Sequence, residues 1–166
     1  MVRGKETVKG LSLILAVGIM IISTLPISVA DVGLFAGCPL SNRLTYPFFH
    51  TSFIHAAINS WCLLTIVFLY ETPLLTFIAA YIISASFPVG ALSFLYNSQC
   101  PTIGLSGMCY VLLGSISLSV GNAKQYWFMI ASVIGIGFLF PEAVNSWLHT
   151  YCYLSGVLIA ILNKPV

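Results

Sequence analysis

Long apolar runs, separated by short polar or charged breaks, dominate the chain. Most runs approach the length of a membrane-spanning helix, for which roughly 20 mostly apolar residues are needed. The breaks lie at Asp31, at 71–73, at 97–101, at 121–124 and at 141–142. The runs between them predict six spans, at about residues 10–30, 53–70, 74–96, 104–120, 125–140 and 144–162.

The composition agrees with a membrane location and excludes several classes of protein. Charged residues make up 6% of the chain and hydrophobic residues 59%, whereas a soluble domain carries about 25% charged residues because its surface faces water. A soluble globular enzyme and a disordered chain are therefore both excluded. The net charge of +2 leaves no basic patch for a nucleic acid. We expect an all-α polytopic membrane protein, with residues 1–166 forming a single six-span domain in the lipid bilayer.

The distribution of lysine and arginine predicts the orientation, because cytoplasmic loops carry an excess of them. With six spans, both termini share one side with the loops near Glu71 and Lys124. That side holds Arg3, Lys5, Lys9, Lys124 and Lys164, and the other side holds Arg43. We therefore expect both termini in the cytoplasm, with the loops 31–49, 97–103 and 141–142 facing outward.

The first apolar run has a second interpretation. A basic start, and Ser28-Val29-Ala30 before Asp31, are typical of a cleaved signal peptide. The apolar stretch of about 20 residues exceeds the roughly 7 to 15 of a usual signal peptide, which favours a retained span. The five later spans keep their orientation in either case.

Polar residues gather at the outer ends of three predicted spans, and such residues are costly in a membrane unless they have a function. His50 and His55 lie at the start of the second span, and His149 lies near the start of the sixth. The fourth span opens with Gly104-Leu105-Ser106-Gly107. The three spans therefore bring a hydroxyl group and three imidazoles to one depth.

Helical spacing sharpens this convergence. Asn59 follows His55 by four residues, so both lie on one helix face. Two stripes of mostly small residues run along the fourth and sixth spans: Ser106, Tyr110 and Gly114, and His149, Cys152, Gly156 and Ala160. Small residues let membrane helices approach closely. If the two stripes pack together, Ser106 meets His149, and Tyr110 lies where it can fix the imidazole plane.

This set of residues has the chemistry of a nucleophilic hydrolase. A serine hydroxyl is a weak nucleophile unless a base takes its proton, and His149 is the candidate base for Ser106. A developing oxyanion needs hydrogen-bond donors, for which His55, the Asn59 amide and the Ser106 backbone N–H are suitable. The pattern places no acidic residue near enough to orient His149, since Glu142 lies in a loop. The expected arrangement is a dyad.

The same motifs resemble those of the rhomboid intramembrane serine proteases, over about residues 43–160. His50, His55 and Asn59 match a His-x4-His-x3-Asn motif, and 104–107 match Gly-x-Ser-Gly. The resemblance implies that Ser106 is the nucleophile, His149 the general base, and His55 and Asn59 part of the oxyanion hole. The supporting residues that it implies are His50, Gly104, Gly107, Tyr110 and Gly156.

The resemblance also implies what the protein acts on. Members of the family cleave transmembrane proteins in or near their membrane spans, without a cofactor. It implies that substrates pass sideways from the lipid past the second and fifth spans. The six-span core suits a prokaryotic plasma membrane, with the active site toward the outer face.

Three other interpretations stay open. A non-catalytic rhomboid-like protein would bind transmembrane clients without cutting them. A small transporter or channel would use the histidines for protons, but it predicts internal repeats and polar groups at mid-membrane. A metal site made of His50, His55 and His149 would lack a clear fourth ligand, so we expect no metal.

The five cysteines fit no zinc motif. Cys38 and Cys100 both lie in predicted outward loops, on the oxidising side of a bacterial membrane. We hypothesise a disulfide between these two cysteines, which would tie the first outer loop to the loop before Ser106. The oligomeric state is not readable from the sequence.

Overall fold

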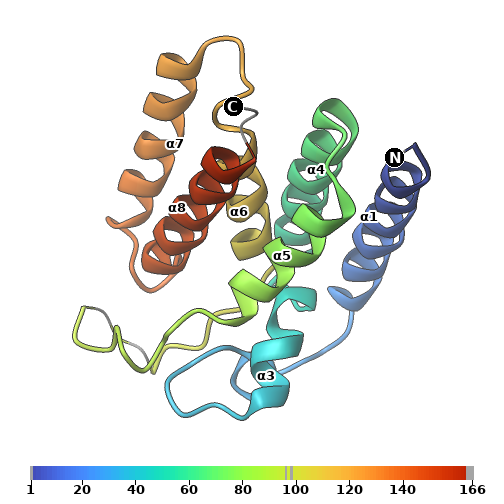
Figure 1. Cartoon of the computed structure of the whole chain (residues 1–166). Helices are drawn as coiled ribbons and strands as arrows, with labels where there is room; N and C mark the ends of the chain where they lie inside the picture. Colours follow the sequence, from blue (N-terminus) through green and yellow to red (C-terminus); the bar gives the residue numbers. More distant parts are fainter. Residues whose placement is uncertain (1, 96, 98, 164–166) are drawn as a thin grey trace.

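The computed structural model describes residues 2–95, 97 and 99–163. Six longer helices form a bundle, and shorter helices lie in the segment between the first two of them (Figure 1). The longer helices are α1 (Val2–Ile22), α4 (Phe53–Tyr70), α5 (Leu74–Ala85), α6 (Ser106–Ile116), α7 (Ala123–Gly137) and α8 (Ser146–Leu162). The shorter ones are α2 (Val29–Val32), α3 (Leu40–Thr45) and the 3-10 turn η1 (Tyr46–Phe48). The described residues contain no strand, which confirms the all-α expectation.

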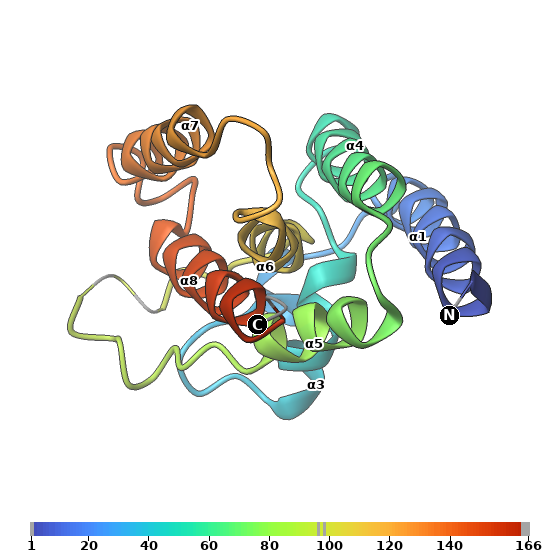
Figure 2. The same cartoon turned by 45° about the horizontal axis from the view of Figure 1, so that its top comes forward.

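Helix α6 lies at the centre of the bundle, where it packs against α8, α5 and α4 (Figure 2). Its residues Met108, Val111 and Leu112 are almost fully buried. Helix α1 packs on α4, and α7 lies outside α8 with only Ile130 and Gly137 buried. The central position of α6 places its first residue, Ser106, where the neighbouring helices can reach it.

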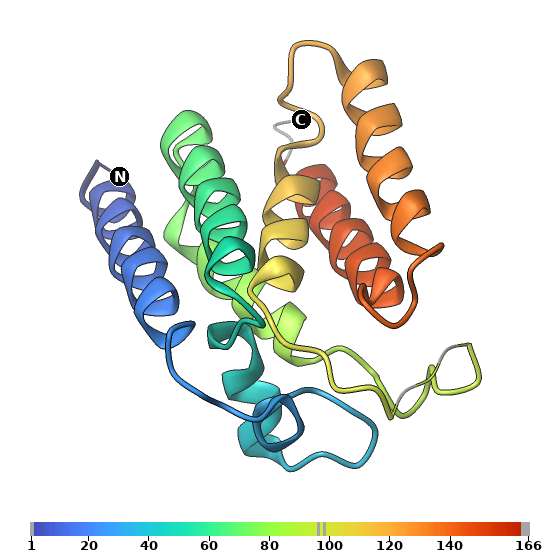
Figure 3. The ribbon, with the colours of Figure 1, turned by 180° about the vertical axis from the view of Figure 1, so that it is seen from behind.

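The helices alternate in direction, as six consecutive spans predict. The start of α1 and the end of α8 lie at one end of the bundle (Figure 3). At this end Lys5 of α1 forms an ion pair with Glu71, the residue that follows α4. The opposite end, which we call the loop end, holds the segments 23–52, 86–95, 99–105 and 138–145.

The helix boundaries differ from the predicted spans. Among the described helices, α4 alone has both the length and the apolar composition of a membrane span. The prediction of a third span over 74–96 is wrong in length, because α5 ends at Ala85, and residue 96 lies outside the described residues. Pro88 explains the early end, since proline cannot donate a backbone hydrogen bond and disfavours helix at the residue before it.

The other boundaries shift by smaller amounts. The helix predicted over 104–120 is shorter, from Ser106 to Ile116, and the one predicted over 10–30 runs from Val2 to Ile22. The prediction of 53–70 matches α4 at both ends. The six helices thus fall where the apolar runs predict them, while the number of membrane crossings stays a prediction.

Candidate active site

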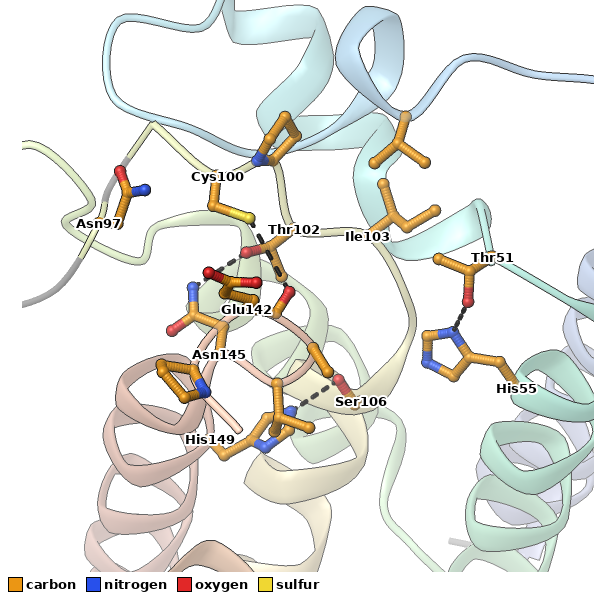
Figure 4. A pocket seen from close by; sticks show the side chains of 15 residues that line it. Thr51, His55, Asn97, Cys100, Thr102, Ile103, Ser106, Glu142, Asn145 and His149 are labelled. Carbon is orange, nitrogen blue, oxygen red and sulfur yellow. Dashed lines mark hydrogen bonds between the residues drawn. The ribbon is translucent and has the colours of Figure 1, made fainter. Parts of the chain in front are cut away.

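Ser106 and His149 meet at the loop end of the bundle. Ser106 is the first residue of α6, and His149 lies in the first turn of α8. The Ser106 Oγ and the His149 Nε2 are 2.9 Å apart, within hydrogen-bond distance (Figure 4). The structure therefore brings together the two residues that the sequence pairs as nucleophile and base.

Close packing between α6 and α8 makes this contact possible. A Cβ atom on Gly114 would lie 2.2 Å from the Tyr153 carbonyl oxygen, and one on Gly156 would lie 2.0 Å from the Val111 carbonyl oxygen. Only glycine fits at either position, so the two backbones touch. The predicted contact between the two small-residue stripes is confirmed.

Tyr110 lies against the imidazole of His149. The two ring centroids are 4.2 Å apart and the ring planes are inclined by 23°. Tyr110 is one helical turn after Ser106, so the same helix that carries the hydroxyl also supplies a flat surface for the base. The two rings therefore stack, and the role of Tyr110 in fixing the imidazole plane stays a prediction.

The backbone before Ser106 runs close to α4. Gly104 has a φ of +120°, a backbone conformation that residues with a side chain rarely adopt. A Cβ atom at this position would lie 2.9 Å from the His55 Cε1 and 3.7 Å from the Asn59 Nδ2. The Gly104 N–H donates to the Tyr46 carbonyl oxygen at 3.0 Å. Glycine is therefore required here both for its backbone angle and for the lack of a side chain.

His50 holds the same stretch of backbone from a different direction. It lies before α4, and its Nε2 accepts a hydrogen bond from the Leu105 N–H at 3.2 Å. This bond needs a neutral imidazole, because a protonated Nε2 cannot accept. Burial, and then the neighbouring His55 at a ring distance of 4.8 Å, lower the pKa of His50 to about 4. His50 therefore stays neutral at ordinary pH and supports the loop that leads to Ser106.

The two candidate oxyanion donors have different surroundings. The His55 Nδ1 lies 3.2 Å from the Thr51 Oγ1, and the ring lines the cavity beside Ser106. Asn59 is buried, lies outside the cavity lining, and donates from Nδ2 to the His55 carbonyl oxygen at 3.1 Å. A carboxamide has two N–H donors, so this bond uses one of them.

Gly107 packs on a buried pair of hydroxyl groups. A Cβ atom on Gly107 would lie 2.3 Å from the Ser84 Oγ and 3.2 Å from the Tyr46 hydroxyl oxygen. The Tyr46 hydroxyl donates to the Ser84 carbonyl oxygen at 3.0 Å. Burial raises the pKa of Tyr46, so the phenol stays neutral. The Tyr46–Ser84 pair, which the sequence does not reveal, thus joins η1 to α5, and the start of α6 packs on it.

A cavity of about 450 Å³ opens beside Ser106 and His149 (Figure 4). Several polar residues outside the predicted set of site residues contribute to its lining: Thr51, Asn97, Cys100, Thr102, Glu142 and Asn145. Of these, Asn145 carried a local signal, because an asparagine before an apolar run is typical of a helix N-cap. The others come from loops, where periodicity gives no information.

Asn145 links the two sides of this cavity. Its Oδ1 accepts from the Leu148 N–H at 3.0 Å and so caps α8. Its Nδ2 donates to the Thr102 Oγ1 at 3.0 Å. The Thr102 backbone is in turn paired with Leu34, in an antiparallel bridge with hydrogen bonds of 2.8 and 3.0 Å. The loop before Ser106 is thus joined to the helix that carries His149.

The hypothesis of a Cys38–Cys100 disulfide is not borne out. Both residues are free thiols, as are the other cysteines of the described chain. The Cys100 Sγ lies 4.0 Å from the Glu142 carbonyl oxygen, so its side chain turns toward the loop before α8 rather than toward the first loop. In the described residues, no group of three or more His, Cys, Asp or Glu side chains has the arrangement of a metal site.

The fold and site define a class of protein: a bundle of apolar helices with a serine at one helix start, hydrogen-bonded to a histidine on the neighbouring helix. Residues 39–164 match the Rhomboid domain, so the chain belongs to the rhomboid family and is an integral membrane protein. No curated protein and no solved structure matches the chain significantly.

Proposed function

We propose that this protein is an intramembrane serine endopeptidase that hydrolyses peptide bonds of transmembrane substrates through Ser106 and His149. The observation that carries the proposal is the 2.9 Å separation of the Ser106 Oγ and the His149 Nε2 at the edge of a cavity of about 450 Å³. A base within hydrogen-bond reach of a hydroxyl is what a serine nucleophile needs. The polar lining of the cavity offers room for water, which the second half of a hydrolysis consumes.

In the proposed first half-reaction, the Ser106 oxygen attacks the substrate carbonyl carbon while His149 takes the hydroxyl proton. The carbonyl oxygen becomes an oxyanion, for which the Ser106 N–H, His55 and Asn59 are the candidate donors. The first N–H groups of a helix have no partner within the helix, so the Ser106 N–H is suited to this role. His149 then gives its proton to the leaving amine as the C–N bond breaks, and an acyl-enzyme forms.

Water completes the proposed reaction. A water molecule in the cavity loses a proton to His149 and attacks the acyl carbon. The tetrahedral intermediate collapses, the carboxyl product leaves, and the Ser106 oxygen regains its proton from His149. No cofactor is needed, and Tyr110 keeps the imidazole in position for each of the proton transfers.

The proposal includes six membrane crossings, made by α1 and α4 to α8, in a single domain with both termini in the cytoplasm. The loop end and the site then face the outer side, for which a prokaryotic plasma membrane is the proposed location. With 11 residues, α6 is ~16 Å long, about half of the roughly 30 Å hydrocarbon core. A short central helix of this kind lets its first residue lie within the depth of the membrane while loops and water reach it.

We propose that substrates approach the site between α4 and α7. An apolar groove of about 440 Å³ runs along α4, lined by Phe53, Ile54, Ala57, Ile58, Trp61 and Cys62. Its Ile54 and Trp61 are 71% and 76% exposed, which suits contact with lipid or with an apolar helix. Helix α7 buries few residues, so it is the element that can move aside with the smallest loss of packing.

Labelling with a fluorophosphonate serine probe tests the proposal on the purified protein in detergent. We expect the wild type to be labelled, and Ser106→Ala and His149→Ala to be unlabelled. Ser93→Ala is the matched control, because Ser93 is an exposed loop serine outside the cavity lining. An unlabelled wild type, in a sample shown to be folded, would contradict the proposed protease activity and favour the non-catalytic interpretation. Crosslinking would then identify bound transmembrane clients.

A further inference from the structure

Glu142 brings a negative charge to the candidate active site. Among the described residues that line the cavity it is the one carboxylate, and it lies in the loop before α8 (Figure 4). The other described lining residues include no lysine, arginine or aspartate. The charge character of this cavity therefore depends on one side chain.

The Glu142 carboxylate has no partner among the described residues. The ion pairs among the described residues are Lys5 with Glu71 and Lys9 with Glu6, which involve α1 and the end of α4. Arg43, on the loop-end side, donates from Nη1 to the Phe87 carbonyl oxygen at 3.0 Å. The contact made by Glu142 is through its backbone oxygen, toward Cys100. Its side chain is thus free to meet a group that enters the cavity.

Orienting the catalytic base is not the role of this carboxylate. Within the described residues no hydrogen bond or ion pair joins Glu142 to His149, whose Nε2 is bonded to Ser106 and whose ring stacks on Tyr110. A serine protease triad requires the acid to contact the histidine. The position of Glu142 fits contact with substrate instead.

We propose that Glu142 forms a subsite for a basic side chain, lysine or arginine, on a substrate segment near the scissile bond. The inference rests on the proposed function and adds a substrate preference to it. A concave site lined by one sign of charge concentrates its electric field, and this attracts ligand groups of the opposite sign. The cavity lining also includes the side-chain oxygens of Thr102 and Asn97, which can accept from an ammonium or guanidinium group. Substrates with an acidic residue at the same place bind less well.

Three fluorophosphonate probes, which share one reactive group and one linker, test the subsite. Their tails end in an ammonium, a neutral alkyl and a carboxylate group. The measured quantity is the second-order labelling rate constant of the purified protein in detergent. In the wild type, we expect the ammonium probe to react about threefold faster than the neutral probe, the size expected of a partly exposed ion pair. The carboxylate probe reacts more slowly than the neutral one.

Two variants locate the effect. In Glu142→Gln, the ratio of ammonium to neutral rate constants falls to about one. In Asp31→Asn, the ratio stays as in the wild type, because Asp31 is an acid in the loop-end segment before α4 that does not line the cavity. The wild-type ratio also shrinks in about 0.5 M salt, which screens charges.

The outcomes separate the subsite from the proposed function. An equal ratio in the wild type and Glu142→Gln, with the neutral probe still reacting, overturns the subsite and leaves the protease proposal standing. A fall of equal size in Asp31→Asn also overturns it, because the effect is then one of overall charge. A wild type that no probe labels removes the proposed function, and the subsite with it.

Discussion

Gly114 of α6 and Gly156 of α8 face each other with no side chain between their backbones. A Cβ atom on Gly156 would lie 2.9 Å from the Gly114 Cα, and one on Gly114 would lie 2.8 Å from the Gly156 Cα. Both helices begin at the loop end, about two turns from this crossing. At that end Ser106 and His149 are 2.9 Å apart. The distance between hydroxyl and imidazole therefore depends on how closely these glycines approach.

We expect Gly156→Ala to lower both stability and labelling by the serine probe. The added methyl group forces α8 away from the Val111 carbonyl, at a cost of about 1–3 kcal/mol for overpacking. Thermal unfolding in detergent and the labelling rate measure the two effects. Gly135→Ala is the matched control, since no atom lies within 4 Å of its added Cβ in α7. Equal losses in the two variants would contradict the crossing as the cause.

Helical periodicity explains why part of the site is predictable. His55 with Asn59, and Ser106 with Tyr110, are each four residues apart, so a helix alone places each pair on one face. Small-residue stripes then indicate which faces pack together. The Ser106–His149 contact follows from these two local patterns without knowledge of the loops.

The loop part of the site is not predictable in this way. Glu142, Asn145 and Thr102 line one cavity because two distant loops adopt one particular conformation, and no periodic pattern records that conformation. The predicted helix lengths are wrong for a related reason. The run of apolar residues continues past Pro88, whereas helical hydrogen bonding does not. The sequence thus identifies the Ser106–His149 pair, and the structure adds the cavity around it.

We expect Gly104→Ala to abolish most of the labelling by the serine probe. At a φ of +120° the backbone of any residue with a side chain is strained, and the new methyl group would lie 2.9 Å from the His55 ring. Gly37→Ala is the matched control, because Gly37 also has a positive φ, +83°, but has no atom within 4 Å of an added Cβ. Both variants carry the backbone strain of a positive φ, about 1–2 kcal/mol in the left-handed helical region and larger at the +120° of Gly104. Similar labelling rates in the two would show that the contact with His55 does not matter.

The neutral state of His50 predicts how stability depends on pH. Its pKa in the folded protein, about 4, lies below the value of about 6.5 in an unfolded chain. Between these values the unfolded chain binds more protons, so the stabilisation from His50 is complete above about pH 6.5 and is lost as the pH falls toward 4.

Comparison with His50→Gln isolates this effect from the titration of other groups. Glutamine can accept from the Leu105 N–H but does not titrate. We expect the midpoint of thermal unfolding, measured in detergent at pH 7.5, 6 and 5, to fall further for the wild type than for the variant. Parallel curves for the two proteins would exclude His50 as the titrating group.

The hydrogen bond from Asn145 to Thr102 predicts a coupling between the loop before Ser106 and helix α8, which carries His149. Asn145→Ser keeps a side-chain oxygen that can cap α8, because serine is about as good an N-cap as asparagine, but it loses the donor to Thr102. Thr102→Val removes the acceptor and leaves the shape of the side chain. Each single variant therefore breaks the same 3.0 Å bond from one side.

If this bond positions the dyad, the double variant reacts with the serine probe about as fast as either single variant. The coupling expected from a double-mutant cycle is about 0.5–1.5 kcal/mol, the usual net contribution of one hydrogen bond. Labelling rates give the coupling in activity, and thermal unfolding gives the coupling in stability. A positioning role requires coupling in the labelling rate under conditions where all four proteins are folded. Additive losses would mean that Asn145 and Thr102 act independently, with Asn145 serving the helix cap alone.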